Sequence, residues 1–393
     1  MSTAIKTIRE VSIGVFDGPH ATPELYEEGA AIFLGIPNLQ ADGRINLTNA
    51  RWVAERDVPK WNRRVTPRAN DIVFTYEATL NRYAIIPHDL ACCLGRRTAL
   101  VRPDPTKIDH RYLFYYFFSP TWRAQIEANT LTGATVDRIP LAKFPDFEVL
   151  VPDLRLQQQI AEILACYDDL IATNQRRITL LEDAARRLYR EWFVQLRFPG
   201  HELVPVMNGL PEGWRRDTLD QALFLQRGFD LPSGNRVPGD VPVYASTGIN
   251  GYHNVAKVDG PGVVTGRSGT LGAVHYAAQD FWPLNTSLWV KEFRAVSPLV
   301  AYFMLSELGL EQFNSGASVP TLDRKIAHQI PVLIPEHTVV SAFDERVQPI
   351  FDQIQILRKS SESTVCARDL LLPKLMSGQL DVSGIPLPDE VAA

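Results

Sequence analysis

The sequence predicts an α+β fold with two similar strand-rich globular domains, separated by two long antiparallel paired helices in a pseudo-two-fold internal repeat. Three observations lead to this prediction. The chain resembles itself at a nearly constant spacing, a helical pattern of unusual length ends each copy, and short β-branched runs lie in the globular part of each copy. Sheets and helices segregated along a chain are typical of the α+β class.

The repeat is clearest where residues 133–152 align with residues 316–335. Without a gap, six of these 20 positions are identical, whereas average composition would give roughly one or two. The alignment joins Gly133-Ala134-Thr135-Val136 to Gly316-Ala317-Ser318-Val319, and Val149-Leu150-Val151-Pro152 to Val332-Leu333-Ile334-Pro335. Two copies of one unit can be related by a pseudo-two-fold axis, which would make their helices antiparallel.

The globular regions match more faintly. Ile72–Thr75 corresponds to Val263–Gly266, and Thr79-Leu80 corresponds to Thr270-Leu271 at the same spacing. A short β-branched run before a turn predicts a strand. Helices that cover these sheets are expected near residues 112–126 and 299–313.

A long helical pattern follows each globular region. Residues 155–193 contain neither Pro nor Gly over 39 residues, which as a straight helix would span about 58 Å. The second pattern weakens across Ser360–Ser363, where we expect an interruption, and recovers at Leu370–Leu372. A narrow apolar stripe of this length favours pairing with another helix, although two ordinary core helices remain an alternative. The residues expected to pair the helices are Ile160, Leu164, Tyr167, Ile171, Phe343, Val347, Ile350 and Ile354.

These patterns divide the chain into six segments. They are a first globular domain (1–152), a first spacer helix (153–197), a Pro- and Gly-rich connector that begins the second repeat (198–214), a second globular domain (215–335), a second spacer helix (336–378) and a tail (379–393).

Composition excludes several classes of protein. Lys and Arg number 40 and Asp and Glu 45, a net charge of −5, so any nucleic-acid surface must be a local patch. The four cysteines, Cys92, Cys93, Cys166 and Cys366, are too few for a disulfide scaffold and form no CxxC pair. No apolar signal-peptide region or run of membrane-spanning length is found, so we expect a cytoplasmic protein.

No catalytic motif is found. The chain has no GxxxxGK[ST] phosphate loop, no Asn/Asp-Pro-Pro-Tyr segment of the kind amino-methyltransferases use, no dinucleotide-binding turn and no HExxH pair. Asp168-Asp169 is expected to lie on a solvated helix face rather than at a metal site. The sequence therefore predicts a recognition protein without catalytic residues, metal or cofactor.

Basic clusters are the positive signal for binding. Seven basic and two acidic residues between Arg44 and Arg68 give a local charge of +5, with Trp52 and Trp61 among them. Such a patch is typical of a surface that contacts a phosphate backbone, although a plain solvated surface also fits. The loop Gly266–Gly272 could bring backbone close to a ligand, and its Arg267 could contact guanine. A glycine-rich hairpin with a surface arginine is the alternative.

Several motifs, in order and in duplicate, resemble a known family. They are Leu210-Pro211-Glu212-Gly213-Trp214, the run from Pro242 to Tyr252, Thr265–Gly272, Leu284-Asn285-Thr286-Ser287, the helix segment Leu156–Leu164 and the ending Leu372–Gly378. Together they resemble the specificity subunit of type I restriction-modification systems over essentially the whole chain. One departure is that the first domain has Thr75–Leu80 where the second has its glycine-rich turn.

The resemblance implies a non-catalytic DNA-recognition subunit. Each globular domain would read one half of a bipartite, non-palindromic site on double-stranded DNA, and the helices would set the spacing and dock two methyltransferase subunits. Motor-nuclease subunits would complete the complex, and S-adenosylmethionine, ATP and Mg would bind those partners rather than this chain. Two inverted modules on a spacer should contact half-sites about 34 Å apart, one DNA turn. The candidate DNA-binding residues are Arg51, Lys60, Arg63, Arg64, Thr75, Tyr76, Arg82, Arg96, Arg97, Arg227, Arg236, Asn250, Tyr252, Arg267, Ser268, Gly269, Asn285 and Thr286.

Two other hypotheses remain open. An interaction scaffold could keep this fold without directing DNA modification, and loss of charge at Arg267 and Arg96 would then leave DNA selectivity unchanged. A self-sufficient nuclease or methyltransferase would need a catalytic motif that we do not find.

Overall fold

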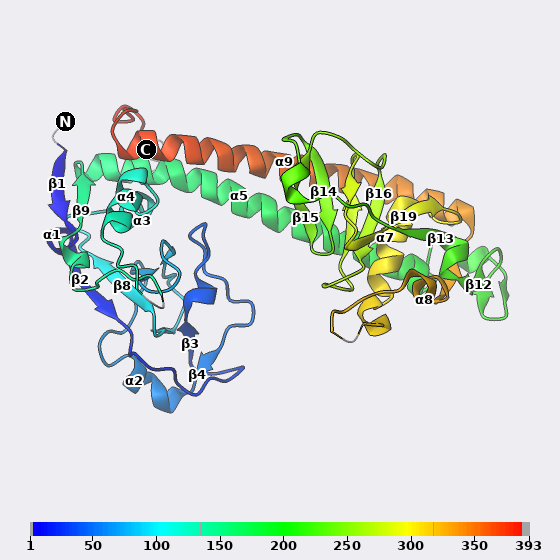
Figure 1. Ribbon diagram of the computed structural model, residues 1–393, viewed down its shortest axis with the longest axis horizontal. Helices are drawn as coiled ribbons and strands as arrows, with labels where there is room; N and C mark the ends of the chain where they lie inside the picture. The colour runs from blue at the N-terminus through cyan, green and yellow to red at the C-terminus, as the bar shows by residue number, and fades with distance from the viewer. Residues whose placement is uncertain (1–2, 134–135, 317, 387–393) are drawn as a thin grey trace. The chain divides into compact units, whose positions relative to one another are not determined.

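The structure is a computed structural model that describes residues 3–133, 136–316 and 318–386 (Figure 1). Ala134, Thr135 and Ala317 of the aligned repeat lie outside the described residues. The chain divides into unit 1, residues 1–172 and 362–393, and unit 2, residues 173–361. Each unit unites a globular region with part of both long helices. This division neither supports nor contradicts the predicted domain boundaries, which stay predictions.

The globular part of unit 1 is built on three sheets. A four-stranded sheet has the order β2-β8-β5-β6, a three-stranded sheet the order β4-β3-β7, and β1 pairs with β9. The elements are β1 (Ala4–Thr7), α1 (Ile8–Val11), β2 (Ser12–Asp17), β3 (Ala31–Leu34), β4 (Trp52–Val53), α2 (Val58–Trp61), β5 (Ile72–Thr75), β6 (Tyr83–Ile85), β7 (Cys92–Leu94), β8 (Thr98–Pro103), α3 (His110–Tyr116), α4 (Pro120–Ala128) and β9 (Glu148–Val151). All four residues of β5 are buried, which its β-branched and aromatic side chains explain.

The globular part of unit 2 has the same sheet organisation. Its sheets have the orders β13-β19-β16-β17, β15-β14-β18 and β12-β20, and a further hairpin pairs β10 with β11. The elements are β10 (Val206–Met207), β11 (Leu210–Pro211), β12 (Arg215–Thr218), α6 (Leu219–Ala222), β13 (Leu223–Arg227), β14 (Val241–Ala245), β15 (Gly248–His253), β16 (Gly262–Gly266), β17 (Val274–Ala277), β18 (Trp282–Pro283), β19 (Ser287–Phe293), α7 (Pro298–Glu307), α8 (Arg324–His328) and β20 (Pro331–Ile334).

Strand register confirms the repeat that the sequence predicted. In unit 1, Val151 of β9 lies opposite Ala4, and in unit 2, Ile334 of β20 lies opposite Arg215. Val151 and Ile334 are therefore equivalent, as the gapless alignment of 133–152 with 316–335 requires. The α+β fold with two similar strand-rich parts is confirmed.

Two long helices connect these parts. α5 runs from Leu154 to Tyr189 and continues into a π-helical turn at Arg190–Val194, and α9 runs from His337 to Met376. The expected interruption of the second helix at Ser360–Ser363 is wrong, because α9 is continuous there. Asn174, which is buried in α5, donates to the Ser360 hydroxyl of α9 at 3.3 Å. A polar contact between the helices thus replaces the apolar pattern at this point.

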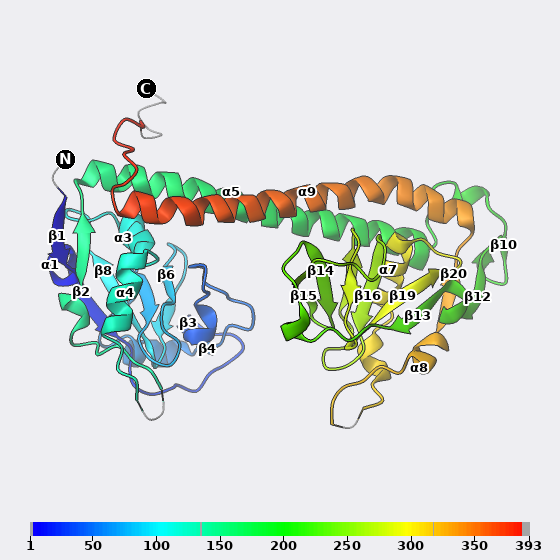
Figure 2. The same cartoon turned by 45° about the horizontal axis from the view of Figure 1, so that its top comes forward.

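Within each unit the two helices lie side by side and antiparallel (Figures 1 and 2). In unit 2, Ile178 packs against Ile354 and Leu357, and Glu182 pairs with Arg358 at 2.8 Å. In unit 1, Arg368 of α9 reaches Asp168 of α5 at 2.6 Å. None of the helices among the described residues is both long and apolar enough to cross a membrane.

The residues predicted to pair the helices lie in two kinds of environment. Ile160 and Leu164 are buried in the core of unit 1, which also contains residues of the globular part, and Phe343 and Val347 occupy the same position in unit 2. Ile354 packs in the cluster between the helices, and Tyr167, Ile171 and Ile350 are half-buried. The apolar residues of each helix therefore pack against a globular part at one end of the helix and against the other helix further along.

Candidate functional site

A loop follows the central strand of each four-stranded sheet, and the same backbone hydrogen bonds hold it in both units. Tyr76 donates its N–H to the Arg97 carbonyl at 3.2 Å and accepts the N–H of Ile139 at 2.8 Å. Arg267 makes the matching bonds to Thr286 at 2.9 Å and from Leu322 at 2.8 Å. Tyr76 and Arg267 are therefore structurally equivalent, as the faint match between the strands that precede them predicts.

The backbone of this loop is also the same in the two units, although the residues differ. Gly269 and Gly272 have φ values of +91° and +83°, and their equivalents Ala78 and Asn81 have φ values of +70° and +59°. A non-glycine residue in this left-handed region is strained, and Asn tolerates it better than Ala. Unit 1 therefore forms the turn without its glycines. The missing glycine motif had indicated a difference between the domains that the backbone does not have.

In unit 2 the loop residues form one hydrogen-bonded cluster. The guanidinium of Arg267 donates from Nη1 to the carbonyl of Asn285 at 3.1 Å, and the Asn285 amide donates to the Asp230 carboxylate. The N–H groups of Arg267 and Ser268 both bond the carbonyl of Thr286, at 2.9 Å and 3.0 Å. Among the residues that the structure describes, only Nη1 of the half-buried Arg267 is hydrogen-bonded, so its Nε and Nη2 donors are available for a ligand.

A second contact in unit 2 joins two further candidates. Arg236 donates from both terminal nitrogens to the Asn250 side-chain oxygen at 3.2 Å, and also to the Asn250 carbonyl. Asn250 and Tyr252 are exposed on β15, and Arg227 is exposed at the end of β13. Hydrogen bonds therefore join several unit 2 candidates in two groups, the cluster at Arg267 and the pair Arg236–Asn250, and neither group includes Arg227 or Tyr252.

In unit 1 the equivalent loop presents different chemistry. The Tyr76 ring is buried, and its hydroxyl donates to the Arg96 carbonyl at 3.2 Å. Burial, with Asp17 and Glu77 nearby, raises the pKa of Tyr76 to about 12, so this phenol is neutral. Thr75 is buried, and Arg97 pairs with Glu77 at 3.1 Å. Arg82 is half-buried and Arg96 is exposed.

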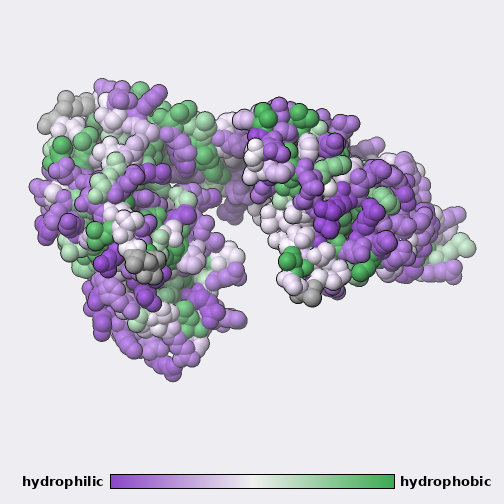
Figure 3. All heavy atoms as spheres, in the orientation of Figure 1, coloured by the Kyte–Doolittle hydropathy of each residue, from purple (hydrophilic) through white to green (hydrophobic). Residues whose placement is uncertain are grey.

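The basic run of unit 1 lies at the surface. Arg51, Lys60, Arg63 and Arg64 are exposed. Figure 3 shows predominantly hydrophilic residues over the end of unit 1 where α2 and β4 lie. Arg64 pairs with Asp17 at 2.5 Å, and Arg51 donates to the Leu25 carbonyl at 2.7 Å. The Asp17 carboxylate therefore offsets one of the positive charges counted along the sequence, whereas the Leu25 carbonyl only restrains Arg51.

The sequence missed the partners of the candidates. Asp230 accepts a hydrogen bond from Asn285, which lies 55 residues away in the sequence, and Asp17 accepts one from Arg64, which lies 47 residues away. Asp168, predicted to lie on a solvated face, is instead bonded to Tyr115 and Arg368. No spacing motif could have indicated these contacts, because each joins segments far apart in the chain. Among the described residues, no group of His, Cys, Asp and Glu side chains is arranged to hold a metal ion.

Comparison with known proteins agrees with this architecture. Residues 22–183 match the family described as the type I restriction modification DNA specificity domain. Over these residues the chain is similar to that family.

Two relatives are similar over most of their lengths. The type I restriction enzyme MjaIX specificity subunit of Methanocaldococcus jannaschii is 23% identical over 84% of this chain and 82% of its own length. The putative type I restriction enzyme MjaX specificity subunit of the same organism is 22% identical over 87% and 85%. Among solved structures, the type I restriction-modification S subunit from M. genitalium has a TM-score of 0.61 at 18% identity and covers 95% of this chain and 96% of its own. This last likeness shows the fold.

Proposed function

We propose that this specificity subunit reads a bipartite, non-palindromic site on double-stranded DNA, with one globular domain for each half-site and no catalytic residue of its own. One observation carries the proposal. The two units share the same hydrogen-bonded loop at Tyr76 and Arg267, yet equivalent positions hold side chains of different hydrogen-bonding capacity. Since base edges are distinguished by donor and acceptor patterns, two such loops select two different sequences.

The candidate residues divide between two roles in this proposal. Exposed cations such as Arg51, Lys60, Arg63 and Arg227 hold the phosphate backbone and contribute affinity without sequence preference. Arg267, which has free donors beside the cluster at Asn285, contacts a base edge, and guanine is its best partner. In unit 1 the base contacts come from Arg82, Arg96 and Arg97 beside the buried Tyr76. Ser268, Gly269, Thr286 and Thr75 shape the loops.

The long helices set the spacing and dock the partners in this proposal. Leu180 of α5 and Ile356 of α9 are exposed apolar side chains, with 59% and 61% of their surface accessible. Such positions suit the helices of two methyltransferase subunits, and motor-nuclease subunits would join that assembly in the cytoplasm. S-adenosylmethionine, ATP and Mg then belong to those partners.

The test is methylation by the assembled complex. The chain is combined with the methyltransferase subunit of the same system and random-sequence DNA, and the methylated adenines are mapped. We expect methylation at one split motif with a fixed gap. Arg267→Ala should relax selection in one half of that motif by about tenfold to a hundredfold, and Arg96→Ala should weaken the other half only.

Matched controls are exposed arginines outside the candidate groups. Arg215 on β12 is 55% exposed and Arg9 in α1 is 65% exposed. Arg215→Ala and Arg9→Ala remove the same charge from the same units and should leave the motif unchanged. Methylation without a sequence preference in the wild-type complex would contradict the proposal, as would an unchanged motif in the Arg267→Ala variant.

A further inference from the structure

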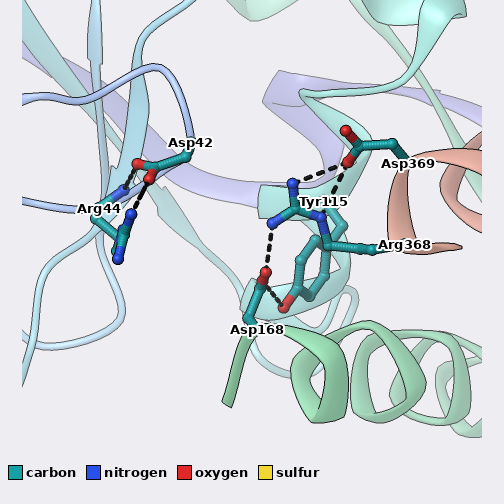
Figure 4. Close-up of polar contacts among 6 residues, drawn as sticks. All are labelled: Asp42, Arg44, Tyr115, Asp168, Arg368 and Asp369. Carbon is teal, nitrogen blue, oxygen red and sulfur yellow. Dashed lines mark hydrogen bonds and ion pairs between the residues drawn. The ribbon is translucent and has the colours of Figure 1, made fainter. Parts of the chain in front are cut away.

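Three elements of unit 1 meet at one carboxylate. Asp168 on α5 accepts a hydrogen bond from the Tyr115 hydroxyl of α3 at 2.7 Å and one from Nη1 of Arg368 on α9 at 2.6 Å (Figure 4). Arg368 also donates from Nε and Nη2 to Asp369, at 3.0 Å and 2.8 Å. The junction therefore ties the first globular domain to both long helices through one connected set of polar atoms, which we call the Asp168 junction (Tyr115, Asp168, Arg368).

The Asp168 junction is partly accessible to water. The Tyr115 residue is only 6% exposed, whereas the side chains of Arg368 and Asp168 are 16% and 33% exposed. Cavities of about 710 Å³ and 700 Å³ both have Asp168 and Arg368 in their walls. Asp42, paired with Arg44 in the loop across from the junction, lines the same cavities, and among the residues drawn in Figure 4 no bond joins this pair to the junction. Burial of Tyr115, with Asp168 beside it, raises the pKa of its hydroxyl, so the hydroxyl stays a donor.

The same point in unit 2 is apolar. The N-cap residues Asp109 and Ser297 align α3 with α7, so Phe303 is equivalent to Tyr115, each at the same place after its N-cap. The repeat alignment, continued into the helices, makes Phe351 equivalent to Asp168 and Ala185 equivalent to Arg368. The Phe303 and Phe351 rings lie 5.9 Å apart at 89°, and Ala185 is fully buried in the same core.

The polar joint of unit 1 and the apolar joint of unit 2 should differ in their physical behaviour. Contacts between uncharged rings are not weakened by the ionic screening that salt provides. Charge-assisted hydrogen bonds fix distance and direction, and a partly exposed ion pair weakens as salt screens it. Buried polar groups are kept in some proteins for the single arrangement that they specify rather than for stability.

We propose that the Asp168 junction is a positioning device that fixes the first globular domain on α5 and α9 and so holds the reading surface for one half-site. The inference rests on the proposed function in assigning a half-site to that domain. Tyr115, Asp168 and Arg368 are positioning residues, which act through the placement of α3. Reading by the first domain then depends on this ionic joint, whereas reading by the second domain does not.

The first experiment uses the full chain without DNA. Hydrogen exchange is followed in α3 and α7 for the wild type, Asp168→Asn and Tyr115→Phe. Asp168→Asn preserves the shape and removes the charge, and we expect α3 amides to exchange about tenfold faster while α7 is unchanged. The matched control is Asp183→Asn on the same helix. It breaks the pair with Arg187, whose side chains are 42% and 78% exposed, and should change neither element.

A transplant variant separates positioning from mere stability. Tyr115→Phe, Asp168→Phe and Arg368→Ala together give the first unit the apolar joint of the second. We expect slow α3 exchange in this variant, without the acceleration that the wild type shows between low salt and about 1 M salt. The proposal would be overturned if the amide exchange rate of α3 in the wild type did not change with salt. It would also be overturned if neither Asp168→Asn nor Tyr115→Phe changed that rate.

The second experiment uses the complex with the methyltransferase subunit. On DNA with the natural gap, Asp168→Asn should methylate about tenfold more slowly, and discrimination against gaps altered by one base pair should fall. Sequence preference at the half-site read by unit 2 should not change. A wild-type complex that selects no split motif would refute the proposed function, and the exchange experiment would still decide the junction. Normal rates and normal gap selection in Asp168→Asn would refute the junction alone.

Discussion

The two units form the same backbone with different side chains. At the loop, Tyr76 and Arg267 make matching main-chain hydrogen bonds. Where α3 and α7 meet the long helices, unit 1 has the Asp168 junction and unit 2 has Phe303 and Phe351. Main-chain hydrogen bonds constrain the fold whatever the side chain, because a buried unpaired N–H or C=O is costly. The comparison shows that the same backbone fold can be built around a polar network in one unit and around aromatic side chains in the other.

A similar exchange occurs inside the sheets. In unit 1 the buried Asp71 accepts two hydrogen bonds from Arg102 of β8, at 2.8 Å and 2.7 Å. Strand register makes Gly262 and Lys291 the equivalents in unit 2, where Lys291 is exposed. At these two sites unit 1 has an ion pair at positions where unit 2 has other residues, and the predictions below test this contrast.

The largest effect should come from the aromatic joint of unit 2. Phe351→Ala removes a ring that contacts Tyr276, Tyr302 and Phe303, so the free energy of unfolding should fall by about 3–5 kcal/mol. Urea unfolding followed by tryptophan fluorescence measures the change. Asp168→Ala, at the equivalent position in unit 1, is the comparison and should cost less. Equal losses in the two variants would show that the joints do not differ in kind.

The ion pair of unit 1 should give the next largest effect. Asp71→Ala leaves the guanidinium of Arg102 without its carboxylate, and that side chain is only 15% exposed. Breaking such a pair from one side costs about 3–5 kcal/mol when it is fully buried, and the partial exposure of Arg102 places this case at the lower end. Urea unfolding of Asp71→Ala and of the double variant Asp71→Ala, Arg102→Leu measures it. The double variant should recover part of the loss, and no recovery would contradict the explanation.

The sequence predicted the features that follow from local pattern and missed those that join distant segments. The two repeat spacings, the strand runs and the length of α5 could all be found in the printed order of residues. The Asp168 junction could not, because its partners lie 53 and 200 residues apart. The loop at Ala78 shows a third case. Its glycines are absent, so sequence pattern alone indicated a different turn, while the surrounding hydrogen bonds impose the same one.

Two opposite substitutions in the turn should each change the free energy of unfolding by about 1 kcal/mol. Gly269→Ala places a Cβ at a φ of +91° and should destabilise unit 2 by about 1–2 kcal/mol, the cost of left-handed backbone. Ala78→Gly removes that strain at a φ of +70° and should stabilise unit 1 by up to about 1 kcal/mol, because the gain is partly offset by chain entropy. Thermal unfolding of both variants measures these shifts. Destabilisation by Ala78→Gly would mean that the Ala78 methyl group makes contacts that outweigh the strain.

The smallest effect concerns acidification, which should weaken unit 2 through one histidine. His328 is buried, and its Nε2 accepts the N–H of Leu225 at 2.9 Å, which requires an unprotonated nitrogen. Burial lowers the pKa of His328, Arg324 and Arg294 lower it further, and Asp220 opposes them. The folded pKa therefore lies below the unfolded value of about 6.5. Below that pH the unfolded chain binds more protons, so this stabilisation is complete above about pH 6.5 and is lost as the pH falls through the folded pKa.

The repeat alignment puts Pro145 of unit 1 at the position equivalent to His328, and Pro145 has no titrating group. Burial also lowers the pKa of His110 in unit 1, and His110 is unchanged in the His328→Gln variant. In His328→Gln the amide oxygen can accept the Leu225 N–H at any pH, so the fall in urea midpoint between about pH 7.5 and pH 5.5 should be smaller than in the wild type. His275, whose pKa burial also lowers, is unchanged in this variant and cancels from the comparison. An identical pH dependence in the two proteins would mean that His328 is protonated equally in the folded and unfolded chains. The hydrogen bond at Leu225 would then contribute nothing that depends on pH.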